Sequence, residues 1–397
     1  MSAKIIIFDS HPVQYKAPVY QELDRLCPGA FEVVYATDVS VRKGNVDREF
    51  GKEVAWDTPL LSGYRYRVLN NERGVPLSTP GSLTGRGVLA LLRTERPAAI
   101  VLTQARYWFD HTAYLSALWL GIPVLIRQET QDDMYAGQRS RIKQMARGLI
   151  YRVLYAPVRH AFAFGSLNFQ HLTRHGISPA RISFARFSVP DPIADFTSEQ
   201  KLLARLRLRQ QLKIGDEQVV LAFFGKLIPK KNPELIFECL RQIPSAVLCR
   251  LHIMVVGSGE LQARLDELAA QAFAQHGVRT SFMGFVNQSA LPPYYLAADI
   301  VALPSRRMGE AWGLVINEAL QAGCGVVMSD AVGCVTEFGR LERVEVIGVE
   351  DRQGLALAIA RLAAMPRDFD WARSHMAQYS SQAAAQALSK TFASYLT

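Results

Sequence analysis

The chain has 397 residues, 49% of them hydrophobic, and a formal net charge of +9 at pH 7. This length predicts two domains, and the composition excludes a disordered or fibrous chain. The five cysteines form no C-x-x-C pair and have no His cluster beside them, which argues against a zinc-finger or disulfide scaffold and predicts free thiols in a reducing compartment.

The N-terminus runs directly into an apolar segment at residues 4–8, which indicates a first strand and no signal peptide. The most apolar stretch, residues 115–126, is interrupted by Gly121 and Pro123 and is too short to span a bilayer. We therefore expect a cytoplasmic protein that could lie peripherally on the inner face of the membrane.

In the first half, short apolar runs rich in β-branched residues alternate with amphipathic segments, which predicts βα units and a parallel sheet. The expected strands are 4–8, 31–36, 98–102, 124–127 and 161–164, and the expected helices include 17–26 and 111–120. Residues 1–190 are therefore predicted to form a first Rossmann-like domain.

Residues 134–190 contain no Asp or Glu and many basic residues, beside apolar positions at 149–154. Such a face suits an anionic membrane surface, an anionic acceptor or a nucleic acid, or it is simply a solvated basic face. No nucleic-acid motif accompanies the charge, so we expect no nucleic-acid partner. The candidate membrane contacts are Arg139, Arg141, Lys143 and Arg147.

Residues 191–217 are polar and charged, include a helix-like segment at 198–212, and are predicted to connect the two domains. A second βα series follows, with expected strands at 219–224, 251–256, 280–282, 300–303 and 326–329. Residues 218–370 are predicted to form a second Rossmann-like domain, and 371–397 a helical segment that could pack back on the first. Open parallel sheets bind ligands beyond the carboxyl ends of their strands, so function is expected in the loops there.

The first candidate site follows the first strand of the second series. Gly225 ends that strand, and Lys226 and Lys231 follow it. A helix is expected to begin near Pro233, with Asn232 as its N-cap. Lysines at the mouth of a sheet, beside a helix N-terminus, favour phosphate binding, and an ordinary basic loop is the alternative.

The second candidate site follows the strand expected at 300–303. Glu310 lies in the loop and could accept hydrogen bonds from sugar hydroxyls, whereas Glu318 lies on the next helix and suits ribose hydroxyls. The backbone N–H groups of Gly313 and Leu314, at the start of this helix, could hold a diphosphate without a metal. Two ordinary helix-surface glutamates are the alternative.

These motifs resemble the nucleotide-sugar domain of the GT-B glycosyltransferases, in particular the retaining family four, or glycosyl transferases group 1. The two glutamates separated by seven residues match that family's hallmark, and Gly225-Lys226 with Lys231 matches its basic loop. Gly284-Phe285-Val286 resembles the turn that cradles the base. The resemblance implies an α/β GT-B fold, with two Rossmann-like βαβ domains facing a central cleft.

The first half resembles one subgroup of the family through residues 11–18, 49–57 and 121–127. Many relatives place a hydroxyl-binding His after the strand expected at 124–127, where this chain has Glu129. His11, Gln14 or Glu129 could substitute for that His. Residues 106–109 would form an aromatic loop suited to stacking on a sugar. Further cleft candidates are Tyr15, Arg106, Tyr107, Trp108 and Arg127; structural alternatives include a salt bridge from Arg127 to Asp132 or Asp133.

The resemblance implies a metal-independent, retaining hexosyl or glycosyltransferase that needs no cofactor. It would move a sugar from a nucleotide-diphosphate sugar to a saccharide or lipid-linked saccharide acceptor in cell-surface glycan synthesis. Lys226, Lys231 and the helix start at Gly313 would stabilise the leaving diphosphate, which would accept the acceptor's proton. Glu310, Lys226 and Lys231 are the catalytic candidates. The alternative is a non-catalytic sugar-nucleotide-binding or scaffold protein of the same fold.

Overall fold

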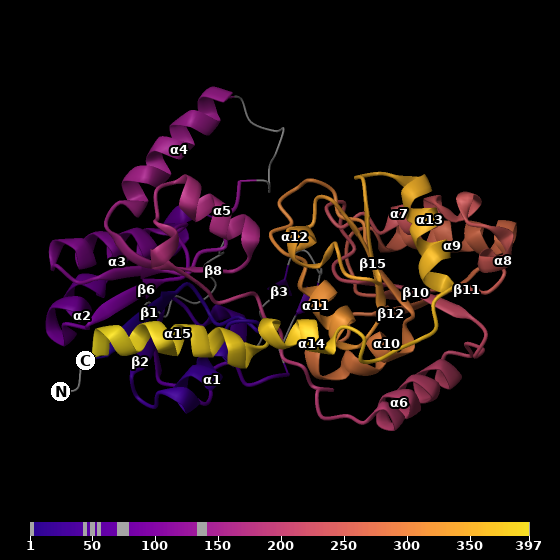
Figure 1. Ribbon diagram of the computed structural model, residues 1–397, viewed down its shortest axis with the longest axis horizontal. Helices are drawn as coiled ribbons and strands as arrows, with labels where there is room; N and C mark the ends of the chain where they lie inside the picture. The colour runs from indigo at the N-terminus through magenta and orange to yellow at the C-terminus, as the bar shows by residue number, and fades with distance from the viewer. Residues whose placement is uncertain are drawn as a thin grey trace.

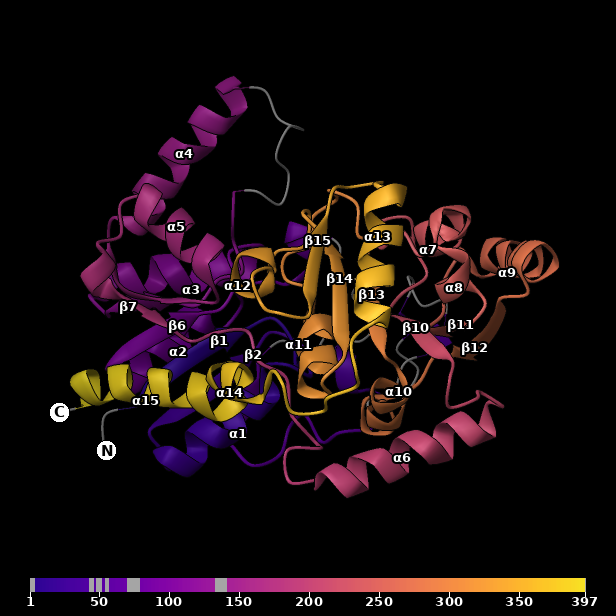
Figure 2. The ribbon, with the colours of Figure 1, turned by 45° about the vertical axis from the view of Figure 1, so that its right-hand side comes forward.

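The computed structural model describes residues 4–42, 46–47, 52–53, 57–69, 79–132 and 141–396. Two α/β units lie side by side, the first formed by the N-terminal half of the chain and the second by the C-terminal half (Figure 1). Each unit contains one parallel sheet with helices on both faces, as the second view also shows (Figure 2). The predicted α/β class with two parallel sheets is therefore confirmed.

The first sheet has seven strands in the order β5-β2-β1-β6-β7-β8-β9, and every neighbouring pair is parallel. Its strands are β1 (Ile5–Asp9), β2 (Phe31–Tyr35), β5 (Tyr66–Val68), β6 (Ala99–Leu102), β7 (Val124–Ile126), β8 (Val158–Ala163) and β9 (Ile182–Phe184). Residues along β1 alternate between two apolar cores, with Ile6 and Phe8 in one and Ile5 and Ile7 in the other. A continuous apolar run is what a central strand covered on both faces requires.

The helices of the first unit are α1 (Ala17–Leu26), α2 (Val88–Glu95), α3 (Trp108–Trp119), α4 (Arg141–Tyr155) and α5 (Ser166–Arg174). Short 3₁₀ turns lie at η1 (Val39–Val41), η2 (Pro80–Ser82) and η4 (Pro179–Arg181). An antiparallel pair, β3 (Val46–Asp47) and β4 (Lys52–Glu53), lies outside the main sheet. Most of the resembling segment 49–57 falls outside the described residues.

The second sheet has six parallel strands in the order β12-β11-β10-β13-β14-β15. These are β10 (Val219–Phe224), β11 (Leu251–Val256), β12 (Arg279–Gly284), β13 (Ile300–Leu303), β14 (Gly325–Ser329) and β15 (Val344–Ile347). The helices around it are α7 (Glu234–Glu238), α8 (Ser245–Leu248), α9 (Gln262–His276), α10 (Pro292–Ala297), α11 (Leu314–Gln321), α12 (Val335–Phe338) and α13 (Arg352–Ala363), with 3₁₀ turns η5 (Leu240–Gln242) and η6 (Gln288–Ala290).

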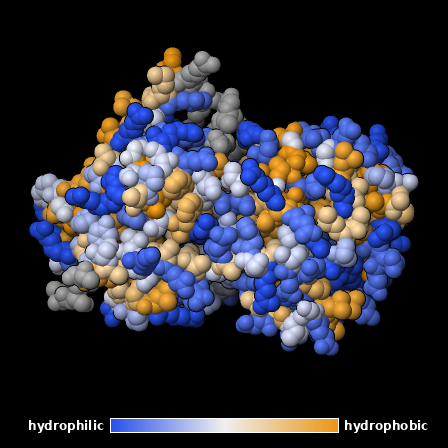
Figure 3. All heavy atoms as spheres, in the orientation of Figure 1, coloured by the Kyte–Doolittle hydropathy of each residue, from blue (hydrophilic) through white to orange (hydrophobic). Residues whose placement is uncertain are grey.

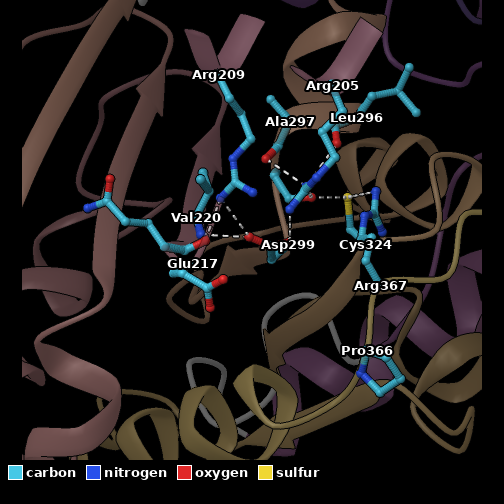
Figure 4. Close-up of polar contacts among 12 residues, drawn as sticks. Arg205, Arg209, Glu217, Val220, Leu296, Ala297, Asp299, Cys324, Pro366 and Arg367 are labelled. Carbon is cyan, nitrogen blue, oxygen red and sulfur yellow. Dashed lines mark hydrogen bonds and ion pairs between the residues drawn. The ribbon is translucent and has the colours of Figure 1, made fainter. Parts of the chain in front are cut away.

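The connecting segment carries one helix, α6 (Ser198–Gln211), which begins with a capping box between Thr197 and Gln200. Two of its arginines fasten it to the amino end of the second sheet (Figure 4). Arg205 donates to the carbonyl of Ala297 at 3.0 Å and pairs with Asp299 at 2.6 Å, and Arg209 reaches the same carboxylate at 3.4 Å. This cluster ties the connection to the second unit, at the sheet edge opposite its ligand-binding loops.

The C-terminal segment is divided into α14 (Arg373–Met376), η7 (Ala377–Tyr379) and α15 (Ser381–Leu396). Helix α15 runs along the first unit beside α1 (Figure 1) and buries Ala385, Leu388 and Phe392 in the core below β1. The chain therefore crosses back from the second unit to the first. The boundaries drawn at residues 190 and 218 stay predictions.

The loop after β10 differs from its predicted form. Asn232 has φ of 52°, in the left-handed region, so the predicted N-cap at Asn232 is wrong and Pro233 takes that place before a helix of only five residues. Asn is one of the few residues besides Gly that tolerate this conformation. The Asn232 side chain instead donates to Glu350 at 3.3 Å.

Candidate active site

A pocket lies where the carboxyl ends of β10 and β11 meet the first unit and the connecting segment. It brings together four of the predicted donor-site residues, Gly225, Val286, Leu314 and Glu318, with Gln14 and Tyr15 of the first unit. The other lining residues are Val189, Pro190, Phe224, Val256, Gly257, Phe285, Gln288, Leu291, Tyr295 and Val315.

Glycines allow the loops after the strands to approach closely at this pocket. Gly257 has φ of 149°, and a Cβ atom there would lie 1.8 Å from the carbonyl oxygen of Gly225. Gly313, with φ of 94°, is the N-cap of α11, and a Cβ atom there would lie 2.8 Å from Val332. Both positions therefore require glycine on conformational and steric grounds.

Glu318 lies on α11 and is held at the pocket wall by two donors. Gln288 donates to one carboxylate oxygen at 2.7 Å, and the Tyr295 hydroxyl donates to the other. The Tyr295 ring stacks on Phe224 with 3.8 Å between ring centroids. Burial raises the pKa of Glu318 above its ordinary value, against the opposing effect of these two hydrogen bonds.

Glu310 lies in the loop between β13 and α11 and is buried, with 7% of its surface exposed. Its carboxylate pairs with Lys231 at 2.7 Å, and Lys230 lies 3.9 Å away while donating to the Gly309 carbonyl at 3.0 Å. Burial alone would raise the pKa of Glu310, but the two lysines hold it below its ordinary value. Two catalytic candidates, Glu310 and Lys231, are thus in contact, and Lys226 is half-buried on the loop that carries Lys231.

On the first unit, the cleft candidates after β1 and β7 form their own contacts. The Tyr15 hydroxyl donates to Glu129 at 3.0 Å, which joins two of the predicted cleft residues. His11 Nδ1 lies 2.8 Å from the Ser10 hydroxyl, and burial lowers the pKa of His11 to about 4, so its imidazole is neutral at pH 7. Gln14 Oε1 is buried and has no hydrogen-bond partner among the described residues.

A buried ion pair lies beneath these residues. Lys16 Nζ is 3.0 Å from Asp9 Oδ1, and Asp9 also accepts hydrogen bonds from Thr103 at 2.8 Å and Tyr20 at 2.9 Å. Sequence analysis missed this network because its members come from β1, α1 and the end of β6. An acidic residue closing an otherwise apolar strand is the signal that could have indicated it.

Arg127 is buried at the end of β7, with its guanidinium 4.4 Å from the centre of the Phe164 ring. It donates to the Ala185 carbonyl at 3.3 Å, while Nε and Nη1 have no hydrogen-bond partner in the described part of the chain. The alternative in which Arg127 pairs with Asp132 is wrong, because Asp132 pairs with Arg174 at 2.8 Å, and Asp133, the other partner considered, lies outside the described residues.

The expected aromatic loop at residues 106–109 is mostly structural. Phe109 is fully buried and packs edge-on against Phe8, with 5.6 Å between ring centroids. Tyr107 is buried at the N-cap of α3. Trp108 is the aromatic side chain of this loop that is exposed, by 61%, and Arg106 beside it is also exposed. The predicted stacking surface is therefore wrong for Phe109 and Tyr107 and stays a prediction for Trp108.

Helix α4 carries most of the predicted membrane contacts. Arg139 lies outside the described residues, as does the side chain of Arg141. Lys143 is exposed, and Arg147 donates to the Tyr151 hydroxyl at 3.0 Å. The helix projects from the molecule and shows apolar side chains at its outer end (Figure 3). Its exposed large apolar residues are Ile142, Met145, Leu149, Ile150 and Val153.

Two contacts missed by the sequence analysis join the two units. Gln131 Nε2, after β7, donates to the Ala311 carbonyl at 3.0 Å. The backbone N–H of Ser166, at the start of α5, donates to Glu337 at 2.5 Å. Each contact joins positions far apart in the sequence, so no local pattern indicates it.

Among the helices in the described ranges, none is long and apolar enough to cross a membrane.

Residues 204–383 match the family model described as Glycosyl transferases group 1. The chain is 31% identical over 129 residues to an uncharacterized glycosyltransferase of Methanocaldococcus jannaschii, covering 32% of this chain and 32% of that protein. It is 34% identical over 172 residues to the D-inositol 3-phosphate glycosyltransferase of Salinispora arenicola, covering 41% of this chain and 36% of that protein. The matches thus span about a third of the length of these curated relatives.

Solved structures match over nearly the whole chain. The Anabaena protein HepE, in complex with UDP and glucose, gives a TM-score of 0.66 at 17% identity and covers 99% of this chain and 100% of that chain. WaaG, a glycosyltransferase involved in lipopolysaccharide biosynthesis, gives 0.61 at 15% identity, covering 98% of each chain. Likeness at such identities shows the fold. Residues 204–383 therefore match the glycosyl transferases group 1 family, and the architecture of the whole chain is the GT-B fold.

Proposed function

We propose that this protein is a retaining, metal-independent glycosyltransferase. It transfers a sugar from a nucleotide-diphosphate sugar to a saccharide or lipid-linked saccharide acceptor, in the synthesis of a cell-surface glycan. The observation that carries this proposal is the pocket that joins Gly225, Val286, Leu314 and Glu318 to the first unit through Tyr15. The match of residues 204–383 to the glycosyl transferases group 1 family supports the same activity.

The pocket wall formed by Glu318, Gln288 and Tyr295 is suited to the nucleoside half of the donor. Gln288 and Tyr295 each occupy one acceptor position on the carboxylate, which has about four such positions. The free positions would accept the ribose hydroxyls, while the turn at Phe285 and Val286 would hold the base. The Anabaena relative is described in complex with UDP and with UDP-glucose, so a uridine nucleotide is the first donor to test.

The Lys231–Glu310 pair is suited to the reacting half of the donor. The Lys231 ammonium would stabilise charge on the leaving diphosphate, and the Glu310 carboxylate would accept hydrogen bonds from sugar hydroxyls. Lys226 and the start of α11 at Gly313 would add positive potential. These groups would stand where charge develops in the transition state, and they would supply the stabilisation for which other enzymes use a metal ion.

The acceptor would bind on the opposite side, against the first unit. We assign this role to the Tyr15–Glu129 pair, His11 and Gln14, whose unpartnered Oε1 is a ready acceptor for a hydroxyl. The Tyr15–Glu129 pair would replace the hydroxyl-binding His of relatives. Arg127 below them contributes a buried positive charge.

Helix α4 favours a peripheral position on an anionic membrane at the cytoplasmic face. Ile142, exposed by 80%, and the apolar residues that follow it would enter the interface, while Lys143 and other basic side chains would meet lipid phosphates. This position would bring the cleft to a lipid-linked acceptor.

The experiment begins with thermal unfolding in the presence of UDP, GDP and ADP and their sugar conjugates. A nucleotide that binds the folded state raises the melting temperature with concentration. The selected nucleotide sugar is then incubated with candidate acceptors, release of nucleoside diphosphate is measured, and the anomeric configuration of the product is read by NMR. Transfer with retention is the expected result. Binding without transfer to any acceptor supports the non-catalytic alternative, and inversion contradicts the proposed mechanism.

A further inference from the structure

Three potential metal ligands meet on the first unit, outside the donor pocket. His171 lies on α5, His175 is the C-cap of that helix four residues later, and Asp132 follows the cleft candidates Arg127 and Glu129 after β7. Both histidines are buried, whereas the Asp132 side chain is 26% exposed. None of the three lines the donor pocket. Histidines at i and i+4 project from the same helix face, a spacing that suits joint coordination of one ion.

The ligand atoms have the separations that a small cation requires. His171 Nδ1 is 2.9 Å and His175 Nε2 is 3.5 Å from the same oxygen, Asp132 Oδ1. All three atoms lie within 4.8 Å of one another. Ligands at zinc-to-nitrogen and zinc-to-oxygen distances stand about 3.3 Å apart around a tetrahedral ion. The two observed distances bracket that value, so small side-chain adjustments would admit the ion.

Further contacts orient two of the three ligands, His171 and Asp132. Nε2 of His171, the ring nitrogen away from Asp132, lies 3.1 Å from the Tyr155 hydroxyl, and Tyr151 packs edge-on against the His171 ring at 4.7 Å. Asp132 Oδ2 pairs with Arg174 at 2.8 Å, which leaves Oδ1 for an ion. Such outer contacts orient the ligands and fix the tautomer in metal sites.

We propose that Asp132, His171 and His175 bind a divalent transition-metal ion of the zinc class, with one coordination position left to water. Imidazole nitrogens with one carboxylate oxygen form a donor set that zinc accepts readily. The partial exposure of Asp132 provides the path by which the ion enters and the water position is filled.

The ion would fasten a cleft-lining segment to α5. Asp132 directly follows Gln131, which donates to the Ala311 carbonyl of the second unit, and α5 begins at Ser166, which donates to Glu337. In both ribbon views α5 lies on the side of the first unit that faces the second (Figures 1 and 2). The site would therefore stabilise the first-unit wall of the cleft without entering the reaction, and it does not depend on the proposed function.

The test uses the untagged, metal-stripped full chain titrated with Co²⁺, which reports coordination through its visible d–d absorption, followed by displacement with Zn²⁺. We expect saturation at one equivalent. His175→Gln and Asp132→Asn should each lower Co²⁺ affinity by more than about 100-fold, beyond the range for loss of an outer contact. Tyr155→Phe, which removes only an outer contact, should lower it by about 10- to 100-fold.

The control is His160→Ala, because His160 is a half-buried histidine of the first unit that hydrogen-bonds Ser183 and lies outside the cluster. It should bind Co²⁺ as the wild type does. Circular dichroism shows whether each variant is folded. If His175→Gln does not fold, the test rests on Asp132→Asn, because the Asn side chain has the same shape as that of Asp. Absence of saturable uptake, or equal uptake by wild type and both ligand variants, would overturn the proposal. UDP-dependent thermal shifts measured on the same samples test donor binding separately.

Discussion

The charged side chains at the two sheet edges that face the cleft have different surroundings. At the second unit, Glu318 accepts a hydrogen bond from Gln288, which lines the pocket, and Glu310 pairs with Lys231 on the loop after β10. At the first unit, the Asp9–Lys16 pair lies beneath the cleft surface and is enclosed by Tyr20 and Thr103. We therefore expect the charge at the second unit to be available to a ligand, whereas the charge at the first unit is committed to the fold.

This difference teaches that burial alone does not distinguish a functional charge from a structural one. Glu310 and Asp9 are both buried carboxylates with a lysine partner. The Asp9 carboxylate accepts hydrogen bonds from several groups, which satisfy its lone pairs within the protein. Glu310 has a lysine on the loop that follows β10, where an incoming phosphate could take that lysine as its own partner. The comparison predicts that substitutions at the first edge change stability and those at the second change turnover.

The largest effect is expected from Lys16→Met. Removing the ammonium leaves Asp9 as an uncompensated buried charge, which should lower the free energy of unfolding by about 3–5 kcal/mol. Urea unfolding measures it. The control is Lys201→Met, because Lys201 is equally buried but its partner Asp370 is 36% exposed and can be hydrated. The free energy of unfolding of Lys201→Met should be lower than that of the wild type by less than about 1 kcal/mol. Equal losses would remove the distinction between the two pairs.

The next effect is expected from Lys231→Ala, which should lower kcat at saturating donor by about 10²- to 10³-fold, since the charge matters most in the transition state. Lys230→Ala is the matched control, because Lys230 belongs to the same loop but lies 3.9 Å from Glu310 and bonds a carbonyl. Its kcat should change much less. Steady-state kinetics with both substrates separates the cases, and an unchanged kcat with a raised KM for Lys231→Ala would count against the role.

The smallest effect is expected at α4. Lys143→Gln should weaken binding to anionic vesicles by about fivefold, the equivalent of about 1 kcal/mol for one basic residue near the surface. Lys390→Gln, an exposed lysine on α15, is the control and should leave vesicle binding unchanged. Co-sedimentation at low and high salt measures both. Equal affinity of the wild type for neutral and anionic vesicles would contradict the proposal that α4 binds an anionic membrane.

Much of the fold could be predicted from the sequence because central parallel strands are short apolar runs. Strands β10, β11 and β13 begin and end at the predicted residues. The strands β5, β9 and β15 were missed because they lie at sheet edges, are partly exposed and mix polar with apolar residues. The two-sheet architecture follows from local pattern, whereas edge strands depend on their neighbours.

The meeting of Gly225, Val286, Leu314 and Glu318 at one pocket could be predicted because these residues follow parallel strands in short motifs, and their role in donor binding stays a prediction. The Lys231–Glu310 contact could not, since it joins two loops separated by 79 residues. The error at Phe109 was avoidable: Phe109, Ala113 and Ala117 recur at helical spacing, and all three are buried on α3. Aromatic residues at a helix start are typical of a core face as well as of a sugar platform, and only packing distinguishes them.

The central claim, that Glu318 binds the nucleoside and Glu310 the transferred sugar, is tested most directly by calorimetry. The active nucleoside diphosphate is titrated into wild type, Glu310→Gln and Glu318→Gln, beside a transfer assay. Glu318→Gln should lose about 10- to 100-fold in diphosphate affinity, because charged hydrogen bonds to the ribose are lost. Glu310→Gln should bind the diphosphate nearly as the wild type does but transfer poorly. Wild-type activity in both variants would contradict the assignment of this pair as the donor site.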